Sequence, residues 1–331
     1  MHRVGIVSYS FEYSLGIFGY QDRTGGRFDV LTLLEKIREA GGDTAQLPDS
    51  MFRSLSDDEL NEVQRKALDL DLQLEMLGGV AWNRGIEGAM HRARRLGCDV
   101  VGCTFGIMTR PNTISTLAEW DEYLVKCRAR YAELLDTAAE LDLKLAIENH
   151  LDFTVEELRD MVRDADSPHA GVLLDVGNPL GTLDDPTAAA DILGPYVVAT
   201  HVKDFAVEDT TRGFRLTMVP LGAGSLRLPA IIEQLKKHIS PDVNFAVELL
   251  NGQQLEINWL EDRFWVPFRN SSARQVAGAL RHVRGKAIDG DQFLSLKDVE
   301  KLPYEEHLAL ELDRATQSVS HLKALLAEPT K

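Results

Sequence analysis

Cysteine is scarce in this sequence, and the N-terminal residues do not resemble a secretory signal. The 331 residues include three cysteines, Cys98, Cys103 and Cys127, and no two of them form a C-x-x-C motif. An odd number of cysteines without such a motif indicates reduced thiols rather than a disulfide framework. The first residues, MHRVGIVSYSFEYS, lack a charged segment followed by an apolar one. Both absences predict a cytoplasmic protein.

Long apolar runs and an excess of basic residues are also absent. No run approaches the roughly 18 apolar residues that a membrane-spanning helix needs, so we expect no membrane partner. Acidic residues outnumber basic residues by 52 to 36, which gives a net charge of −16. Binding to nucleic acid depends largely on Lys and Arg side chains that neutralise phosphates. We therefore expect no nucleic-acid partner either.

Eight β-rich runs alternate with helical patterns along the chain. The sequences Ser56-x-x-Glu59 and Thr154-x-x-Glu157 have the capping-box form that marks the start of a helix. Regular alternation of strands and helices favours an α/β fold of the closed (β/α)8 TIM barrel type over an open doubly wound sheet. The eight runs are residues 4–8, 44–47, 72–77, 99–104, 143–148, 171–175, 197–202 and 245–249.

The spacing changes after the eighth run, where a long segment rich in aromatic residues begins. A loop of this length in a compact domain is usually functional. The alternative is a patch that covers another subunit. The segment spans residues 251–270 and contains Trp259, Phe264, Trp265 and Phe268.

Two domains follow from this organisation. We assign residues 1–285 to the barrel and expect a helix at 273–283 to resume its pattern. Residues 214–219 are predicted to form an accessory strand or hairpin arm. Residues 286–331 form a C-terminal extension with a helix at 304–326, which we expect to pack on the barrel or on a partner.

Four apolar runs end in side chains that can bind a metal. They end in Glu148, Asp175, His201 and Glu248. Because the carboxyl ends of parallel barrel strands converge on one face, residues far apart in the sequence meet there. Three carboxylates and one imidazole suit Mn²⁺, Mg²⁺, Co²⁺ or Zn²⁺. Burying three carboxylates without a cation would be costly, so we predict a divalent-metal site.

The motifs at these strand ends resemble those of xylose isomerase-like TIM barrels. They are ENH at 148–150, LLDVGN at 173–178, HVKD at 201–204 and VEL at 247–249. The resemblance covers about residues 1 to 285, and it implies that the four strand-end residues are metal ligands and that Mn²⁺ or Mg²⁺ is the ion. The superfamily includes sugar epimerases, inosose dehydratases, endonuclease IV and the large subunits of C-glycoside deglycosidases.

Departures from individual members narrow the choice. Ketose 3-epimerases similar to this chain usually carry His three residues after the Asp ligand, where this chain has Asn178. They also have Arg shortly after the His ligand, where this chain has HVKD. Endonuclease IV uses additional His ligands that we do not find. The HVKD form is closer to the dehydratase-like branch, and these mismatches, with the negative charge, place an epimerase and a nuclease below a lyase. Among the members, the chain looks most like C-glycoside deglycosidase large subunits.

His150 is the candidate base. It lies two residues after Glu148, and positions i and i+2 of an extended segment face the same side. A neutral imidazole is suited to removing a proton next to a ketone, while a cation stabilises the enolate. The likeness of ENH to the deglycosidase motif implies the same role. The alternative is that His150 only forms a hydrogen bond to Asp152 or to a backbone carbonyl.

Several outcomes are open once an enolate exists. We expect a metal-dependent lyase that removes the proton next to the ketone of a 3-keto sugar derivative and expels the C1 substituent. The alternative is a keto-sugar epimerase or isomerase, a dehydratase or a decarboxylase, and epimerisation would use Glu248 as a second acid or base. The candidate catalytic residues are thus His150, Glu148 and Glu248, and the candidate substrate-binding residues are Glu75, Asn178 and Lys203. The alternative for Lys203 is an ion pair with Asp204 or another acid, and for Glu75 and Asn178 it is a purely structural role.

The two aromatic segments are compatible with binding a second chain. The first loop, with Tyr9 and Phe18, and residues 251–270 suit either a flat aglycone or a small second subunit. We expect an oligomer. A different class of function, a non-catalytic sugar-binding or scaffold protein that keeps the barrel, is the remaining alternative, and one bound metal per chain would speak against it.

Overall fold

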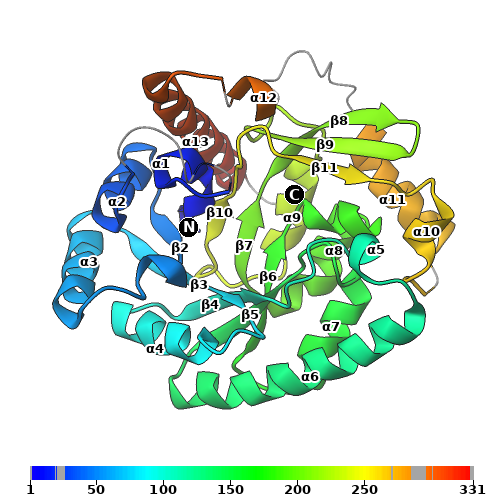
Figure 1. The fold of residues 1–331 in the computed structure, drawn as a ribbon, viewed down its shortest axis with the longest axis horizontal. Coiled ribbons are helices and arrows are strands. Elements are labelled where there is room, and N and C mark those ends of the chain that lie inside the picture. Colours follow the sequence, from blue (N-terminus) through cyan, green and yellow to red (C-terminus); the bar gives the residue numbers. More distant parts are fainter. Residues whose placement is uncertain are drawn as a thin grey trace.

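A closed barrel of eight parallel strands forms the centre of the molecule (Figure 1). The computed structural model describes residues 2–18, 20, 27–269, 271–284, 296–299 and 301–328. Neighbouring strands pair in the order β1-β10-β7-β6-β5-β4-β3-β2, which confirms the predicted TIM barrel. The strands are β1 (Val4–Val7), β2 (Thr44–Pro48), β3 (Gln73–Val80), β4 (Val100–Thr104), β5 (Lys144–Glu148), β6 (Ala170–Asp175), β7 (Val197–Val202) and β10 (Phe245–Val247).

Helices surround the barrel, and their starts follow the sequence signals. Capping boxes are present at Ser56 and Thr154, as predicted, and also at Thr116. The longer helices are α2 (Val30–Glu39), α3 (Asp57–Asp69), α4 (Ile86–Leu96), α6 (Leu117–Glu140), α7 (Val155–Asp164), α8 (Pro186–Leu193), α9 (Leu228–Lys236), α11 (Ala273–Arg284) and α13 (Tyr304–Ala327). Short helices are α1 (Glu12–Leu15), α5 (Arg110–Thr113), α10 (Asp262–Trp265) and α12 (Leu296–Val299), with 3-10 turns at Ser8–Phe11, Asp49–Met51, Asn178–Thr182 and Gly194–Tyr196.

A second, antiparallel sheet lies beside the barrel (Figure 1). It consists of β8 (Asp204–Thr210), β9 (Gly213–Val219) and β11 (Gln254–Ile257). The hairpin of β8 and β9 confirms the predicted accessory arm at 214–219. The segment 251–270 is not a plain loop, because β11 pairs with β9 and α10 follows it. Alternating apolar residues in the Gln254–Ile257 stretch were too few to predict this strand.

Arg110 links the aromatic segment, residues 251–270, to the barrel through its contacts. Its buried guanidinium carbon lies 3.7 Å from the ring centre of Trp120 and 4.4 Å from that of Phe268. Its Nη1 atom donates a hydrogen bond of 2.7 Å to Glu157, and Nη2 donates to the carbonyl of Pro267. Part of the aromatic segment is therefore held in the protein core rather than presented to a partner.

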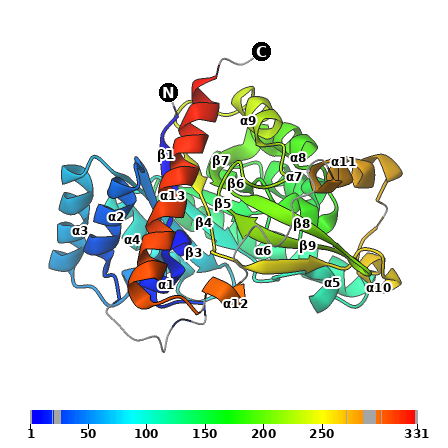
Figure 2. The same ribbon diagram turned by 90° about the horizontal axis from the view of Figure 1, so that it is seen from above.

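The last helix lies against the first strand of the barrel. Helix α13 contacts β1, β10 and α9, and Figure 2 shows it running beside β1. Helix α11 contacts α8 instead. Thus α13, rather than the helix predicted at 273–283, completes the ring between the eighth strand and the first. The domain boundary predicted after residue 285 lies outside the described residues and stays a prediction.

Two further features concern the cysteines and the helices. The thiols of Cys98, Cys103 and Cys127 are free and buried. Among the described residues, no helix combines the length and the apolar character that crossing a membrane requires.

A buried pair of carboxylates links α1 to α13 and makes stability depend on pH. Burial, followed by the charge of Glu311, raises the pKa of Glu12 to about 8, although the backbone N–H of Asn251 donates to Glu12. A raised carboxyl pKa destabilises the folded state as pH increases from about 4.5 toward 8.

We expect Glu12→Gln to remove this penalty. The substitution should leave the free energy of unfolding nearly unchanged at pH 4.5 and increase it by about 1 to 3 kcal/mol at pH 9. Urea denaturation at the two pH values measures the difference. Equal effects at both pH values would contradict the assignment.

A candidate metal centre at the barrel mouth

The four predicted metal ligands lie together at the carboxyl end of the barrel. Glu148 ends β5, Asp175 ends β6, His201 lies in β7 one residue before its end, and Glu248 follows β10. Side chains alternate along a strand, so the residue two positions earlier on each strand also faces the barrel interior. These earlier residues form an apolar layer beneath the polar cluster; they are Ala146, Leu173, Ala199 and Ala246.

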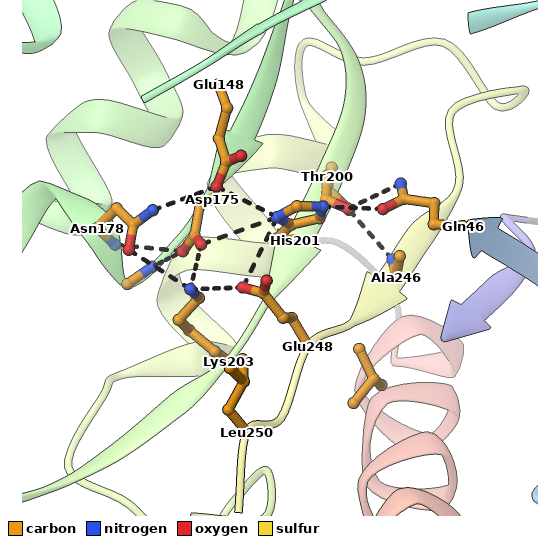
Figure 3. Close-up of polar contacts among 12 residues, drawn as sticks. Gln46, Glu148, Asp175, Asn178, Thr200, His201, Lys203, Ala246, Glu248 and Leu250 are labelled. Atoms are coloured by element: carbon orange, nitrogen blue, oxygen red, sulfur yellow. Dashed lines mark hydrogen bonds and ion pairs between the residues drawn. The ribbon is translucent and has the colours of Figure 1, made fainter. Parts of the chain in front are cut away.

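Three carboxylates surround the Nδ1 atom of His201 (Figure 3). This atom lies 3.4 Å from Glu148 Oε1 and 3.7 Å from Glu248 Oε2. Its distance to Asp175 Oδ2 is 4.0 Å. Ligand atoms of Glu148, Asp175 and His201 all lie within 4.8 Å of one another, and all four side chains are buried. The barrel thus assembles oxygen and nitrogen donors around a small space.

Lys203 enters the same cluster. Its buried Nζ atom lies 2.5 Å from Asp175 Oδ2 and 2.5 Å from Glu248 Oε2 (Figure 3). Asn178 completes the arrangement, because its Nδ2 donates to Glu148 at 3.4 Å and its Oδ1 accepts from Lys203 at 3.4 Å. Two of the three predicted substrate-binding residues, Lys203 and Asn178, therefore lie beside the proposed ligands, and their contact with substrate stays a prediction.

The charges of the cluster strongly affect one another. Burial favours a neutral imidazole, but the charges of Glu248 and Glu148 outweigh it and raise the pKa of His201 to about 9. Burial also opposes ionisation of Glu148, yet His201 lowers the pKa of this carboxyl to about 2. Burial raises the pKa of Asp175 to about 6 despite the ammonium of Lys203. The cluster is therefore an environment in which added positive charge is stabilising.

A divalent cation fits this set of donors. His201 Nδ1 is a buried atom that forms no hydrogen bond with the described residues, and the buried oxygens Asp175 Oδ2 and Glu248 Oε2 are held only by their ion pairs with Lys203. Buried polar atoms normally have hydrogen-bond partners, so a group of acceptor atoms that faces one space fits a bound cation. Carboxylates and an imidazole are ligands suited to Mg²⁺, Mn²⁺ or Zn²⁺. A Glu-Asp-His group that can bind a metal is present, and the identity of the ion stays a prediction.

Backbone and side-chain hydrogen bonds aim Asp175 at the cluster. Its Oδ1 accepts from the backbone N–H groups of Gly177 at 2.9 Å and Asn178 at 3.2 Å, which leaves Oδ2 for the centre. Asn149 joins β5 to β6, because its side chain donates to the carbonyl of Asp175 and accepts from its N–H. A Cβ atom on Gly177 would lie 2.8 Å from Cγ of Lys203, so only glycine lets the lysine pass.

Glu75 is placed behind His201 rather than with Lys203 and Asn178. Its Oε2 accepts a hydrogen bond of 2.6 Å from Gln46, and its Oε1 accepts one of 2.7 Å from Asn244. Gln46 in turn lies 2.8 Å from Nε2 of His201. Both oxygens of Glu75 have partners inside the protein, so its predicted contact with substrate has no support in these hydrogen bonds and stays a prediction.

His150 lies next to the cluster, but not for the reason that we expected. Strand β5 ends at Glu148, and the N–H of His150 donates to the carbonyl of Glu148 at 3.0 Å, which closes a three-residue turn. The i and i+2 argument for an extended segment therefore does not apply. Burial favours the neutral form, but Glu148 and Asp152 outweigh it and raise the pKa of His150. The half-buried imidazole thus lies within the electrostatic reach of the ligands.

Three residues near the centre were missed by sequence reasoning. Asn149 stands inside the ENH motif, but its pairing with β6 leaves no sequence signal. Gln46 lies 155 positions from His201, so no spacing connects them. Tyr9 was assigned only to an aromatic loop, whereas burial, followed by the charges of Glu248 and Glu148, raises the pKa of its hydroxyl.

This fold and this arrangement of strand-end ligands define a class of protein. The model of the xylose isomerase-like TIM barrel family matches residues 34–266. The chain therefore belongs to the xylose isomerase-like TIM barrel family, as its motifs predicted.

Three individual proteins that resemble this chain share 25% sequence identity with it or less. A 3-oxo-isoapionate decarboxylase from Pectobacterium atrosepticum is 25% identical over 250 residues, which cover 74% of this chain and 84% of that protein. The structure of a D-psicose 3-epimerase from Clostridium cellulolyticum superposes with a TM-score of 0.61 at 16% identity, covering 99% of this chain and 100% of that chain. A 3-keto-D-glucoside 4-epimerase from E. coli gives a TM-score of 0.56 at 15% identity, covering 86% and 100%. These two similarities concern the fold. The cytoplasmic location, the oligomer and the second subunit stay predictions.

Proposed function

We propose that the protein is a divalent-metal-dependent lyase acting on a 3-keto sugar derivative. The observation that carries the proposal is the convergence of Glu148, Asp175, His201 and Glu248 on one space. His150 follows in the turn at the end of β5, where the charge of Glu148 acts on its imidazole. Such an arrangement would offer a place for a cation and a base to the same substrate. Membership in a family of sugar-processing TIM barrels supports a carbohydrate substrate.

The side chains of this chain have separate tasks in the proposed reaction. A bound divalent cation supplies Lewis-acid polarisation of the substrate's ketone. His150 accepts the proton from the carbon next to that ketone at one of its ring nitrogens. The electron pair of this C–H bond then forms the C1=C2 double bond as the bond from C1 to its substituent breaks. The substituent leaves with the bonding pair and takes up a proton from protonated His150 or from water.

Lys203 and Asn178 are suited to hold the substrate. The ammonium of Lys203 already binds two carboxylates at 2.5 Å, so it is able to bind a carboxylate or an enolate oxygen of the substrate. The amide of Asn178 lies within 3.4 Å of both Lys203 and Glu148 and offers a donor and an acceptor to sugar hydroxyls.

Decarboxylation of a 3-oxo sugar acid is the second candidate. The curated relative with 25% identity is a 3-oxo-isoapionate decarboxylase, and Lys203 gives this chain a buried cation for a substrate carboxylate. In this reaction the bond between the carboxylate and the carbon next to the ketone breaks. Its electron pair moves into the enolate, carbon dioxide leaves, and His150 or water returns a proton to the carbon.

Product analysis separates these reactions. The Mn²⁺-loaded protein is incubated in D₂O with a 3-oxo-C-glycoside and, separately, with a 3-oxo sugar acid. Release of the aglycone supports the lyase with a C1 leaving group, and release of carbon dioxide supports the decarboxylase. Deuterium uptake without release of either product would instead support an epimerase. If the metal-loaded protein gave no product and no exchange, alone or with a candidate small subunit, the proposal would fail.

A further inference from the structure

We propose that Gln46 is a positioning residue that makes Nδ1 of His201 the nitrogen facing the three carboxylates. The inference rests on the proposed metal site and assigns a role to a row of hydrogen-bonded polar side chains behind it. This row consists of Gln46, Glu75 and Asn244, which are 1%, 5% and 2% exposed. Burying such a row of polar side chains inside a barrel costs free energy, because each polar group must be desolvated. We therefore assign the row a role, which is to orient the imidazole of His201.

Glu75 determines which way the amide of Gln46 points. The Nε2 group of Gln46 donates to Glu75 Oε2 at 2.6 Å, while Asn244 donates to the other carboxylate oxygen at 2.7 Å. Burial raises the pKa of Glu75, while the hydrogen bonds from Gln46 and Asn244 favour the ionised carboxylate, which only accepts hydrogen bonds. The NH₂ group of Gln46 faces this carboxylate, which turns its carbonyl oxygen toward His201.

The orientation of Gln46 in turn determines where His201 carries a hydrogen. Gln46 Oε1 lies 2.8 Å from Nε2 of the imidazole (Figure 3). Since the amide oxygen is only an acceptor, Nε2 must carry the hydrogen. The other neutral tautomer would place two acceptors in contact. Nδ1 is consequently the nitrogen whose lone pair is available to a cation among Glu148, Asp175 and Glu248.

Replacing the amide should weaken metal binding without removing a ligand. Gln46→Met keeps a similar shape but offers no strong acceptor to His201 Nε2, so the competing tautomer becomes available. Loss of such a partner typically lowers metal affinity about 10- to 100-fold. We expect this increase in the Kd for Mn²⁺, measured by titration calorimetry on the full chain. In the Mg²⁺-loaded wild-type protein, long-range ¹H–¹⁵N spectra should show hydrogen on Nε2 and none on Nδ1.

An exchange of side chains provides the matching rescue. In Gln46→Glu/Glu75→Gln, the new carboxylate accepts from His201 Nε2 and from the amide of residue 75, whose oxygen accepts from Asn244. The charge and all three hydrogen bonds are kept, so the Kd should stay within about threefold of wild type, well below the 10- to 100-fold loss typical of a missing partner. Thr200→Val is the control, because the hydroxyl of Thr200 forms its hydrogen bonds with backbone groups: Oγ1 donates to the carbonyl of Asn244 and accepts from the N–H of Ala246. It should leave the Kd unchanged.

The outcomes distinguish this inference from the proposed function. If wild type binds Mn²⁺ and Gln46→Met binds it equally well, Gln46 does not position His201. Loss of Mn²⁺ affinity in the folded exchange variant Gln46→Glu/Glu75→Gln would also overturn the inference. If Gln46→Met does not fold, the exchange variant decides whether Gln46 positions His201. If the wild-type chain binds no Mn²⁺ at all, the metal site itself is wrong and the inference falls with it.

Discussion

Asp175→Asn is expected to abolish binding of the divalent metal and to lower kcat/KM by about three orders of magnitude or more. The reason lies in how the side chain is held. Oδ1 accepts from the N–H groups of Gly177 and Asn178, so an asparagine must place its carbonyl oxygen there. Its NH₂ group then occupies the position of Oδ2 and directs hydrogens toward the cation. The substitution thus replaces a negatively charged ligand oxygen with an NH₂ group whose hydrogens repel the cation.

Elemental analysis of the dialysed variant measures this effect, and Asp184→Asn is its control. Asp184 is also a buried carboxylate at this end of the barrel, where it accepts from Thr182 and from the N–H of Val155. It does not contact the cluster, so this variant should retain the wild-type metal content. Wild-type metal content in Asp175→Asn would show that the ion, if present, binds elsewhere.

His150→Gln is expected to retain the metal but to lose most of the catalytic rate. A positioned general base typically contributes about 10²- to 10⁴-fold, and glutamine cannot accept a proton at neutral pH. The predicted loss is in kcat, with KM little changed, because the amide still fills the place of the ring. Steady-state kinetics with the substrate identified by product analysis, together with the metal content, provide the measurement.

The same substitution at His169 is a suitable control. His169 contacts the carbonyl of Leu143 at 2.8 Å, at the beginning of β6 and thus at the opposite end of the barrel. His169→Gln should leave kcat unchanged. Wild-type turnover in His150→Gln would remove this residue from the mechanism. Loss of metal in the same variant would instead make it a part of the cation site.

Much of the fold and the location of the centre follow from local patterns. Each strand that supplies a candidate ligand is a short apolar run ending in a carboxylate or an imidazole. The convergence of these ends is a property of parallel barrels. Glu148, Asp175 and His201 could therefore be grouped without coordinates, and the structure places them within 4.8 Å of one another.

Other features depend on tertiary contacts that leave no periodic signal. The apolar face of α13 shows that it packs, but not that it packs on β1 and β10 in place of α11. The role of Gln46 depends on a neighbour 155 positions away. For His150, the turn after Glu148 breaks the extended geometry on which its predicted direction was based. In each case the sequence identifies the residue type and the fold supplies the partner.

Anomalous diffraction from crystals soaked in Mn²⁺ is the most direct test of the metal centre. We predict one strong peak per chain, within about 2.5 Å of oxygens from Glu148, Asp175 and Glu248 and of Nδ1 of His201. Lys203 should then have moved away from the position between the two carboxylates. Absence of a peak at this position, with Lys203 still paired to Asp175 and Glu248, would contradict the account.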